Sequence, residues 1–294
     1  MYDEILEKMS NIKDSPLFKT YGPSVEYAYQ HPRYPTLLTL KSPEWLYDEL
    51  TNPENANHFK SDLAKRILAL PHDALRQDLE QIIMYHIGQT CDNIPDNYDA
   101  NGYAGTICNA MVLLSEVGNG DSSLDVVLEF LRQNDEFYEY HFGDMSGDFL
   151  PNIIYKIGNN RLDKLMAFLK EEGLLSVSKS MVTMAVLFIA ILSPLRRQEV
   201  IEWFRQLIAF AIQALPQTKS FDVDLAGFFV TDLIDIAAEE LLPEIKELFA
   251  TNLVGISICG KYDEVCKIIR KKKYLRKPDE ITINIYDLFK TVEY

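Results

Sequence analysis

The stretch KIGNNRLDKLMAFLK, residues 156–170, contains the signals of one helix end, a tight turn and the start of a second, amphipathic helix. An apolar residue precedes Gly158, and Leu162, Met166 and Leu169 follow at the i, i+4, i+7 spacing of one apolar helix face. A small residue between two apolar sets is typical of a helical hairpin. Other parts of the chain carry the same arrangement.

Four further segments align with this one when each turn is used as the anchor. Their turn residues are Pro71, Gly118, Ser193 and Ala237. With Gly158 included, the turns lie 47, 40, 35 and 44 residues apart, near the roughly 40–47-residue period of two-helix HEAT-type repeats. Because a two-helix unit cannot bury its apolar face alone, such units must stack. The sequence therefore predicts an all-α fold, an α-solenoid of about five HEAT-like hairpins over residues 58–270, with an irregular helical bundle as the alternative.

The two ends of the chain differ from this repeat. Residues 1–57 hold six of the thirteen prolines and several tyrosines, which predicts a short helix and an extended segment that caps the first repeat with its aromatic side chains. Residues 271–294 form a basic carboxyl-terminal extension. Its last part alternates apolar and polar residues from Ile281 to Ile285, like a strand. Both an edge segment and a tail that pairs with a partner remain open.

The composition indicates a folded protein that resides in the cytoplasm. The chain has 294 residues, 47% of them hydrophobic, and a formal net charge of -15. The acidic start MYDEILEKMS lacks the basic and apolar regions of a secretory signal. The longest apolar run, residues 181–192, is short for a bilayer span and predicts a buried helix. The negative charge opposes general binding to phosphate backbones, so a nucleic-acid partner is not expected.

Neither a metal nor another cofactor is expected. The cysteines show no CxxC spacing and are expected to be reduced, packed thiols, and the histidines are scattered. Residues 96–103, DNYDANGY, imitate the start of an EF-hand loop, but Cys108 stands where a bidentate glutamate is needed. The long polar loop at residues 88–102 instead offers Tyr98 and Asp99 as candidate binding residues, because long loops on repeat proteins often carry binding.

A second candidate binding segment is NDEFYEYHFGDMSGDFLP, residues 134–151. Tyr138, Tyr140, His141 and Asp144 mix aromatic and acidic groups, which favours a recognition surface for a basic or amphipathic peptide. The alternative is a connection between repeats whose aromatic side chains are buried. His141 and Asp144 form a conceivable acid/base pair, but no nucleophile stands at a recognisable spacing. No catalytic residue is therefore assigned.

The basic segment KIIRKKKYLRK, residues 267–277, is the candidate site for a polyanion. Its candidate residues are Arg270, Lys271, Lys272, Lys273 and Arg276. A solvated helix end, whose cations favour the carboxyl terminus of a helix, is the simpler interpretation. Docking to an acidic partner or to the protein's own acidic surface is a further one.

Three stretches carry a resemblance to a known family: PHDALRQDLEQII at 71–83, GDMSGDFLPNIIYKIGN at 143–159 and DLAGFFVTDLIDIAAEELLPEIKELFATNLV at 224–254. With them the chain resembles an uncharacterised bacterial domain-of-unknown-function family of HEAT-like helical repeat proteins. The resemblance implies the repeat fold but no activity and no catalytic residues. Some members end in a zinc-binding SEC-C motif; no cysteine follows Cys266 here, so zinc is not implied.

The function most consistent with the sequence is that of a non-enzymatic scaffold or adaptor for a protein or peptide partner. Searches for the GxSxG, GxGxxG, GxxxxGK[ST] and HExxH motifs find none. Binding of a polyanion or nucleic acid through the basic segment is one alternative, and an enzyme with an unrecognised site is another.

Overall fold

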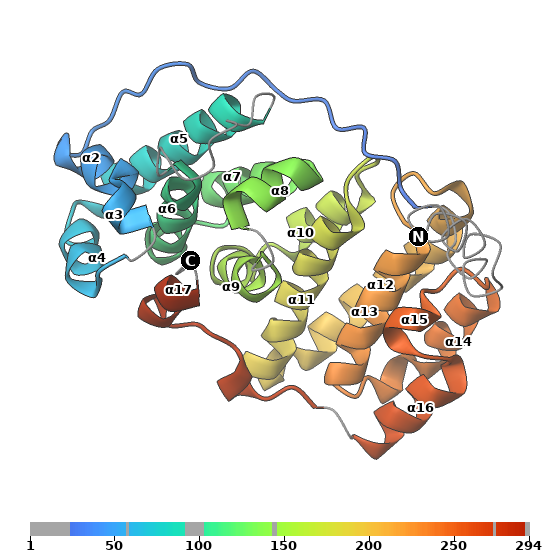
Figure 1. Cartoon of the computed structure of the whole chain (residues 1–294). Coiled ribbons are helices and arrows are strands. Elements are labelled where there is room, and N and C mark those ends of the chain that lie inside the picture. Colours follow the sequence, from blue (N-terminus) through green and yellow to red (C-terminus); the bar gives the residue numbers. More distant parts are fainter. Residues whose placement is uncertain (1–23, 57–58, 92–102, 143–145, 273–274, 292–294) are drawn as a thin grey trace, which may run out of the picture.

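The computed structural model describes residues 24–56, 59–91, 103–142, 146–272 and 275–291. Every regular element within these residues is a helix, and they contain no strand. The helices follow one another as an extended stack of antiparallel pairs (Figure 1). The predicted all-α solenoid is confirmed.

The stack has two layers, and each helical pair contributes one helix to each layer. Layer A consists of α4 (Ser61–Leu68), α6 (Tyr103–Val117), α9 (Ser146–Gly158), α11 (Ser176–Leu192), α13 (Val223–Asp235) and α15 (Ile256–Cys259). Layer B consists of α5 (His72–Thr90), α7 (Ser122–Leu131), α10 (Leu162–Lys170), α12 (Arg197–Ala214), α14 (Leu242–Ala250) and α16 (Tyr262–Lys271). One continuous apolar core lies between the layers.

Each of the five predicted turns joins a layer A helix to the layer B helix that follows it. Several of the apolar residues that defined the pattern, among them Leu124, Leu169 and Leu233, are fully buried. The last turn residue, Ala237, has a φ of 45°, a left-handed conformation that glycine adopts at less cost. The structure adds a sixth pair, α15 and α16, whose first helix is too short to show a periodicity. The predicted pattern is therefore correct but ends one pair early.

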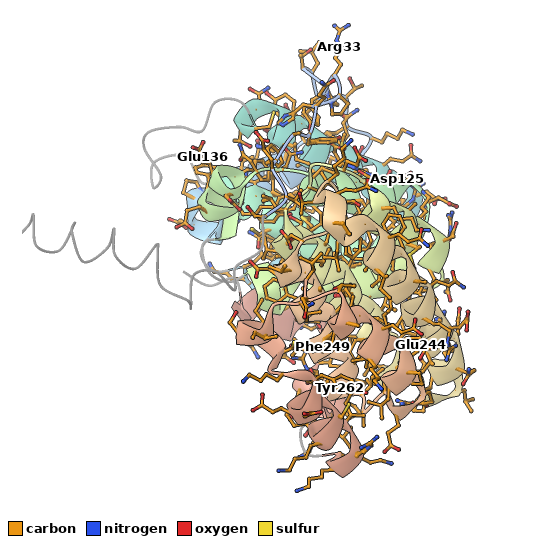
Figure 2. All side chains as sticks on the ribbon, turned by 90° about the vertical axis from the view of Figure 1, so that its right-hand side faces the viewer. Arg33, Asp125, Glu136, Glu244, Phe249 and Tyr262 are labelled. Carbon is orange, nitrogen blue, oxygen red and sulfur yellow. The ribbon has the colours of Figure 1, made fainter. Side chains whose placement is uncertain are left out.

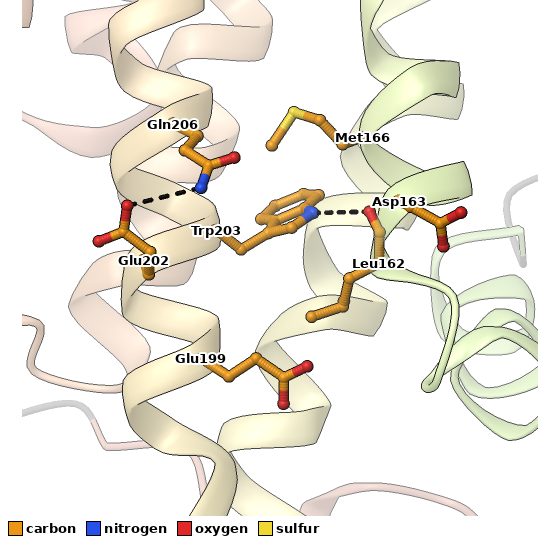
Figure 3. A pocket seen from close by; sticks show the side chains of 7 residues that line it. All are labelled: Leu162, Asp163, Met166, Glu199, Glu202, Trp203 and Gln206. Atoms are coloured by element: carbon orange, nitrogen blue, oxygen red, sulfur yellow. Dashed lines mark hydrogen bonds between the residues drawn. The ribbon is translucent and has the colours of Figure 1, made fainter.

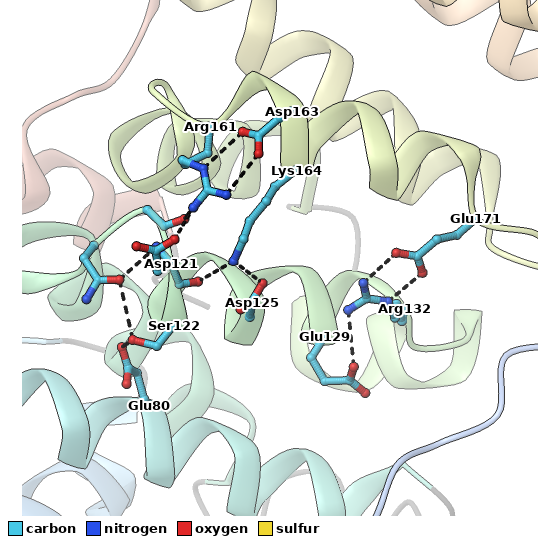
Figure 4. A network of polar contacts seen from close by, with 12 residues as sticks. Glu80, Asp121, Ser122, Asp125, Glu129, Arg132, Arg161, Asp163, Lys164 and Glu171 are labelled. Atoms are coloured by element: carbon cyan, nitrogen blue, oxygen red, sulfur yellow. Dashed lines mark hydrogen bonds and ion pairs between the residues drawn. The ribbon is translucent and has the colours of Figure 1, made fainter.

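Polar contacts between neighbouring pairs repeat the same period (Figure 4). Lys164 Nζ lies 2.7 Å from Asp125 Oδ1, 39 residues away, and Arg132 donates two hydrogen bonds to Glu171, also 39 residues away. Arg205 Nε contacts Glu244 in the same way, again 39 residues along the chain. Exposed pairs of this kind stabilise a fold by up to about 1 kcal/mol each, so their main effect is to set the register between pairs.

Three short helices in the first half of the chain lie outside the two layers. α2 (Trp45–Thr51) and α3 (Pro53–Ala56) pack on α6, and α8 (Asp135–Phe142) packs on α6 between the second and third pairs. Leu46 and Leu50 of α2 are fully buried. Of these, α2 and α3 cover α6 near the start of the stack.

Residues 24–43, here called the strap, have no regular secondary structure and run along one edge of the stack (Figure 1). The strap starts beside α13, where Val25 N–H donates to Asp222 Oδ2. It ends beside α5, where Lys41 and Ser42 N–H both donate to Asp78. Between these ends, the Tyr29 and Tyr34 hydroxyls donate to Glu129 of α7, so aromatic residues of this segment contact the second pair, whereas the expectation placed them on the first.

The carboxyl-terminal segment crosses back over layer A (Figure 1). α17 (Ile285–Thr291) packs on α6 and α9, and the ring of Phe289 stacks on that of Phe59 with centroids 4.6 Å apart. Ile281 and Ile285, which suggested a strand, are buried, and a helix begins at Ile285. The apolar side chains of this tail thus complete the core of the protein itself.

No single helix in the described ranges combines the length and the apolarity needed to cross a bilayer. The pair Ser176–Leu192 and Pro194–Gln217 meets those criteria only jointly, with a bend of 116° between its two parts.

Candidate partner-binding groove

Three of the predicted binding residues lie in the interior. Tyr138 and Tyr140 are 6% and 3% exposed, and His141 is fully buried on α8. The Tyr138 hydroxyl lies 3.0 Å from Ser178 Oγ, and His141 Nε2 lies 3.2 Å from Thr90 Oγ1. These side chains form the buried connection that was the alternative interpretation, and they present no recognition surface. The remaining candidates in the two loops, Tyr98, Asp99 and Asp144, lie outside the described residues.

The basic candidates separate into two groups. Arg270, Lys271 and Lys272 are exposed at the carboxyl end of α16, where their positive charges interact favourably with the helix dipole. Arg276 turns back to the protein: its Nε lies 3.1 Å from Asp235 Oδ2, and its N–H donates to the Asp235 carbonyl. Lys273 lies outside the described residues. Arg276 therefore docks on the protein's own acidic surface.

A groove on layer B, between α10 and α12, is the candidate site (Figure 3). It has a volume of about 390 Å³ and is open to solvent. Trp203 projects from α12 toward α10, and its Nε1–H donates to the Leu162 carbonyl at 3.0 Å. Met166 and Leu162 complete an apolar floor. The hydrogen bond fixes the indole ring, so the floor is rigid.

Acidic side chains surround this floor. The seven lining residues include three acids, Asp163, Glu199 and Glu202, one amide, Gln206, and no lysine or arginine. The three acids come from two helices, which places negative charge on both sides of the Trp203 ring (Figure 3). An apolar floor with an acidic rim is complementary to a segment that carries both apolar and cationic side chains.

Each of these carboxylates accepts a hydrogen bond from an arginine on its own helix or turn. Arg161 lowers the pKa of Asp163, and Arg205 lowers the pKa of Glu202, in each case chiefly through that hydrogen bond. Arg196 lowers the pKa of Glu199 in the same way. All three carboxylates are therefore ionised at neutral pH. A cationic ligand would share them with arginines that lie outside the groove.

Away from the groove, burial shifts the pKa values of Lys179 and Asp232 toward neutrality. Burial lowers the pKa of Lys179 to about 7, and its Nζ donates to the Ser220 carbonyl at 2.6 Å. Burial also raises the pKa of Asp232 to about 7. Within the part of the chain that is described, no three His, Cys, Asp or Glu side chains are grouped as metal ligands would be. All four cysteines are buried, and none of them forms a disulfide.

The spacing of acidic residues around Trp203 in the sequence indicates the groove. Glu199, Glu202 and Trp203 stand at i, i+3, i+4 and so share one face of α12. The apolar residues of this helix were assigned to the core as a group. The acidic residues beside Trp203 distinguish an edge of the core that reaches the surface.

The two layers of stacked helical pairs define the class of the protein, an α-solenoid. Its sequence matches the profile of a family described as "Protein of unknown function (DUF1186)" over residues 57–287, and the chain belongs to that family. The match includes the start of α17 and excludes the strap. No curated protein and no solved structure shows significant similarity to the chain.

Proposed function

We propose that the protein is a cytoplasmic, non-enzymatic scaffold or adaptor that binds a partner protein in the groove between α10 and α12. The observation that carries this proposal is the groove itself, with Trp203 in its floor and three ionised acids at its rim. The complementary ligand is a segment that bears lysine or arginine beside apolar residues. Because each acid is already paired with an arginine, the ligand gains only part of the attraction of its charge, and we expect a micromolar Kd, a binding free energy of about 8 kcal/mol.

Trp203 provides a direct test. The chain contains only two tryptophans, so Trp45→Phe leaves Trp203 as the only indole in the protein. A synthetic amphipathic peptide of lysine and leucine should change its emission in a saturable way, and a glutamate and leucine peptide should not. Added salt should weaken the binding, since the rim interaction is electrostatic.

Charge neutralisation separates the groove from the net charge of the molecule. D163N/E199Q/E202Q should weaken binding of the basic peptide about tenfold, which corresponds to about 1.4 kcal/mol. The control E136Q/E239Q/E247Q removes the same number of charges from exposed positions outside the groove. Equal losses in the two variants would show general attraction to an acidic protein and would contradict the proposal.

The basic end of α16 supports a second candidate function. Arg270, Lys271 and Lys272 are exposed side by side, an arrangement that suits a polyanion. Fluorescence anisotropy of a labelled single-stranded oligonucleotide would test it. Binding that falls steeply with salt and is lost in R270A/K271A/K272A would favour this candidate.

A further inference from the structure

The strap lies on the stack in the manner of a bound peptide. From Ser24 to His31, its residues alternate between exposed and half-buried, as in an extended chain with every second side chain turned to one surface. Val25, Tyr27, Tyr29 and His31 are the half-buried ones. Arg33 projects outward from the strap (Figure 2). From Ser24 to His31, the half-buried side chains thus lie on one face of the strap.

The surface beneath the strap, here called the channel, presents mainly hydrogen-bond acceptors to it. Its central residue is Glu129, which is 7% exposed. The Tyr29 hydroxyl donates to Glu129 Oε2 at 2.7 Å, and the Tyr34 hydroxyl donates to Glu129 Oε1 at 2.6 Å. Burial and the hydrogen bond to this carboxylate raise the pKa of both phenols, so they remain donors. Gln133 Nε2 also donates to the Tyr34 oxygen, at 3.1 Å.

The channel also binds the strap's backbone at points far apart in the fold. Asp222 and Asp78 accept backbone N–H groups near the two ends, as described above, and the Gly173 carbonyl accepts the Ala28 N–H at 3.0 Å. Asp78 and Asp222 are 2% and 4% exposed. Acceptors for the main chain give affinity without regard to side-chain identity, whereas Glu129 selects hydroxyl donors.

Two glycines make room for the strap. A Cβ atom at Gly88 would lie 2.4 Å from Tyr34 Cβ, and one at Gly173 would lie 3.0 Å from the Ala28 nitrogen. Gly173 also has a φ of 71°, which side-chain-bearing residues rarely adopt. The helical stack is therefore shaped to accept an extended chain at these two places.

The strap combines polar contacts with partial burial of Tyr29, Tyr34, Leu38 and Leu40 against the core. No residue from Ser24 to Trp45 is fully buried; the first that is lies in α2. The strap also lies outside residues 57–287, the part that matches the family. Hydrogen bonds that replace bonds to water contribute about 0.5–1.5 kcal/mol each, and about 1.5–3 where a charged group takes part. A chain with the same donors could therefore exchange with it.

We propose that the channel is a recognition site for an extended, tyrosine-bearing segment of a partner protein, and that the strap occupies it in cis as a competitor. The partner segment would place two tyrosyl hydroxyls on Glu129 and backbone N–H groups on Gly173 and Asp222. This site is separate from the groove between α10 and α12 and does not depend on the function proposed for that groove.

The test uses the full chain with a specific protease site inserted after Pro43, which is exposed. Cleavage keeps every residue present but makes the strap a separate, exchangeable fragment. A fluorescein-labelled peptide of residues 24–43 should bind the cleaved protein, as measured by anisotropy, at least about tenfold more tightly than the uncleaved protein, in which the tethered strap competes. No exchange, or unfolding upon cleavage, would overturn the proposal by showing that the strap is a fixed part of the fold.

Variants of the peptide test the chemistry. Y29F/Y34F removes both hydroxyls that reach Glu129 and should weaken binding at least about tenfold. The control peptide E26Q/Q30E changes only outward-facing residues, keeps the net charge, and should bind as the native sequence does. Equal binding of the Y29F/Y34F and native peptides would overturn recognition through Glu129.

A final peptide tests whether a foreign segment is accepted. It keeps only Val25, Tyr27, Tyr29 and Tyr34 on a background of alanine and serine. Binding within about tenfold of the native peptide, or about 1.4 kcal/mol, would support recognition of a partner that carries this pattern. Complete loss would restrict the channel to the strap itself and would overturn a site for partners.

Discussion

The buried carboxyl group of Asp232 should make the protein less stable as the pH rises toward 7. Asp232 lies on α13, is 5% exposed, and its Oδ2 has no hydrogen-bond partner among the described residues. Burial raises its pKa from 3.8 to about 7; a hydrogen bond from Thr183 and the charge of Arg276 act in the opposite direction, and the charge of Asp235 adds to the increase. The folded protein thus holds a proton on Asp232 at a pH where the unfolded chain has lost it.

The folded and unfolded states bind different numbers of protons at Asp232, and this difference sets how stability changes with pH. Between pH 4 and pH 7 the unfolded state binds fewer protons at this position than the folded state, so the free energy of unfolding falls as the pH rises. Each pH unit inside this window contributes about 1.36 kcal/mol. From pH 5 to pH 7 the wild-type protein should lose about 2.3 kcal/mol of unfolding free energy through Asp232, after allowance for half-protonation near pH 7.

Asp232→Asn removes the titrating group with little change in shape. Urea denaturation at pH 5, 6 and 7 measures the free energies of unfolding of both proteins. The stability of the variant relative to wild type should rise by about 2.3 kcal/mol over this range. Thr183→Val removes a hydrogen bond to the carboxylate, so the fall of unfolding free energy with pH should continue to a higher pH than in wild type. The double variant D232N/T183V should not show this fall. A difference between wild type and D232N that does not vary with pH would refute the reasoning.

Three further predictions concern other parts of the fold. From pH 7 to pH 9 the free energy of unfolding of the wild-type protein should rise by about 2–3 kcal/mol through Lys179, because the unfolded chain keeps the lysine proton to a higher pH than the folded protein does. Lys179→Met should lack this rise, and a pH-independent difference between the two proteins in urea denaturation would contradict this. Phe289→Ala should destabilise the tail by about 3 kcal/mol and expose the basic segment to trypsin, whereas Asp287→Asn, at an exposed position of the same helix, should digest at the wild-type rate. Gly173→Ala should cost about 1–2 kcal/mol of unfolding free energy, of which A28G/G173A should recover only part, because the backbone strain remains; full recovery would refute the strain.

The order of the helical pairs was predictable because it depends on local periodicity. Leu124, Met166 and Phe204 are buried at the positions that their spacing predicts, and the turns at Gly118 and Gly158 join the expected helices. In a solenoid each unit contacts mainly its neighbours, so a pattern within one unit nearly determines its environment.

The candidate binding residues were predicted less well, because exposure depends on neighbours that are distant in the chain. Tyr138 and Tyr140 look like interface residues beside acids, yet α8 packs on α6 and places both in the core. Trp203 is a core residue, as its spacing predicts, but its edge also lines the floor of a groove. The side of a helix that reaches solvent is decided by what packs on it. At the far end of the stack, for example, the rings of Phe249 on α14 and Tyr262 on α16 contact each other, so each is partly covered by a side chain from another helix (Figure 2).

The sequence by itself determined the helical class, the repeat period and the places of the turns, because hydrophobic spacing and turn residues act over a few positions. Only the tertiary structure decided the paths of the two ends. The strap reaches α13 through a hydrogen bond between residues 25 and 222, and the tail returns to layer A through the contact of Phe289 with Phe59. No local pattern encodes such pairings, because each depends on a surface that exists only after the stack has formed.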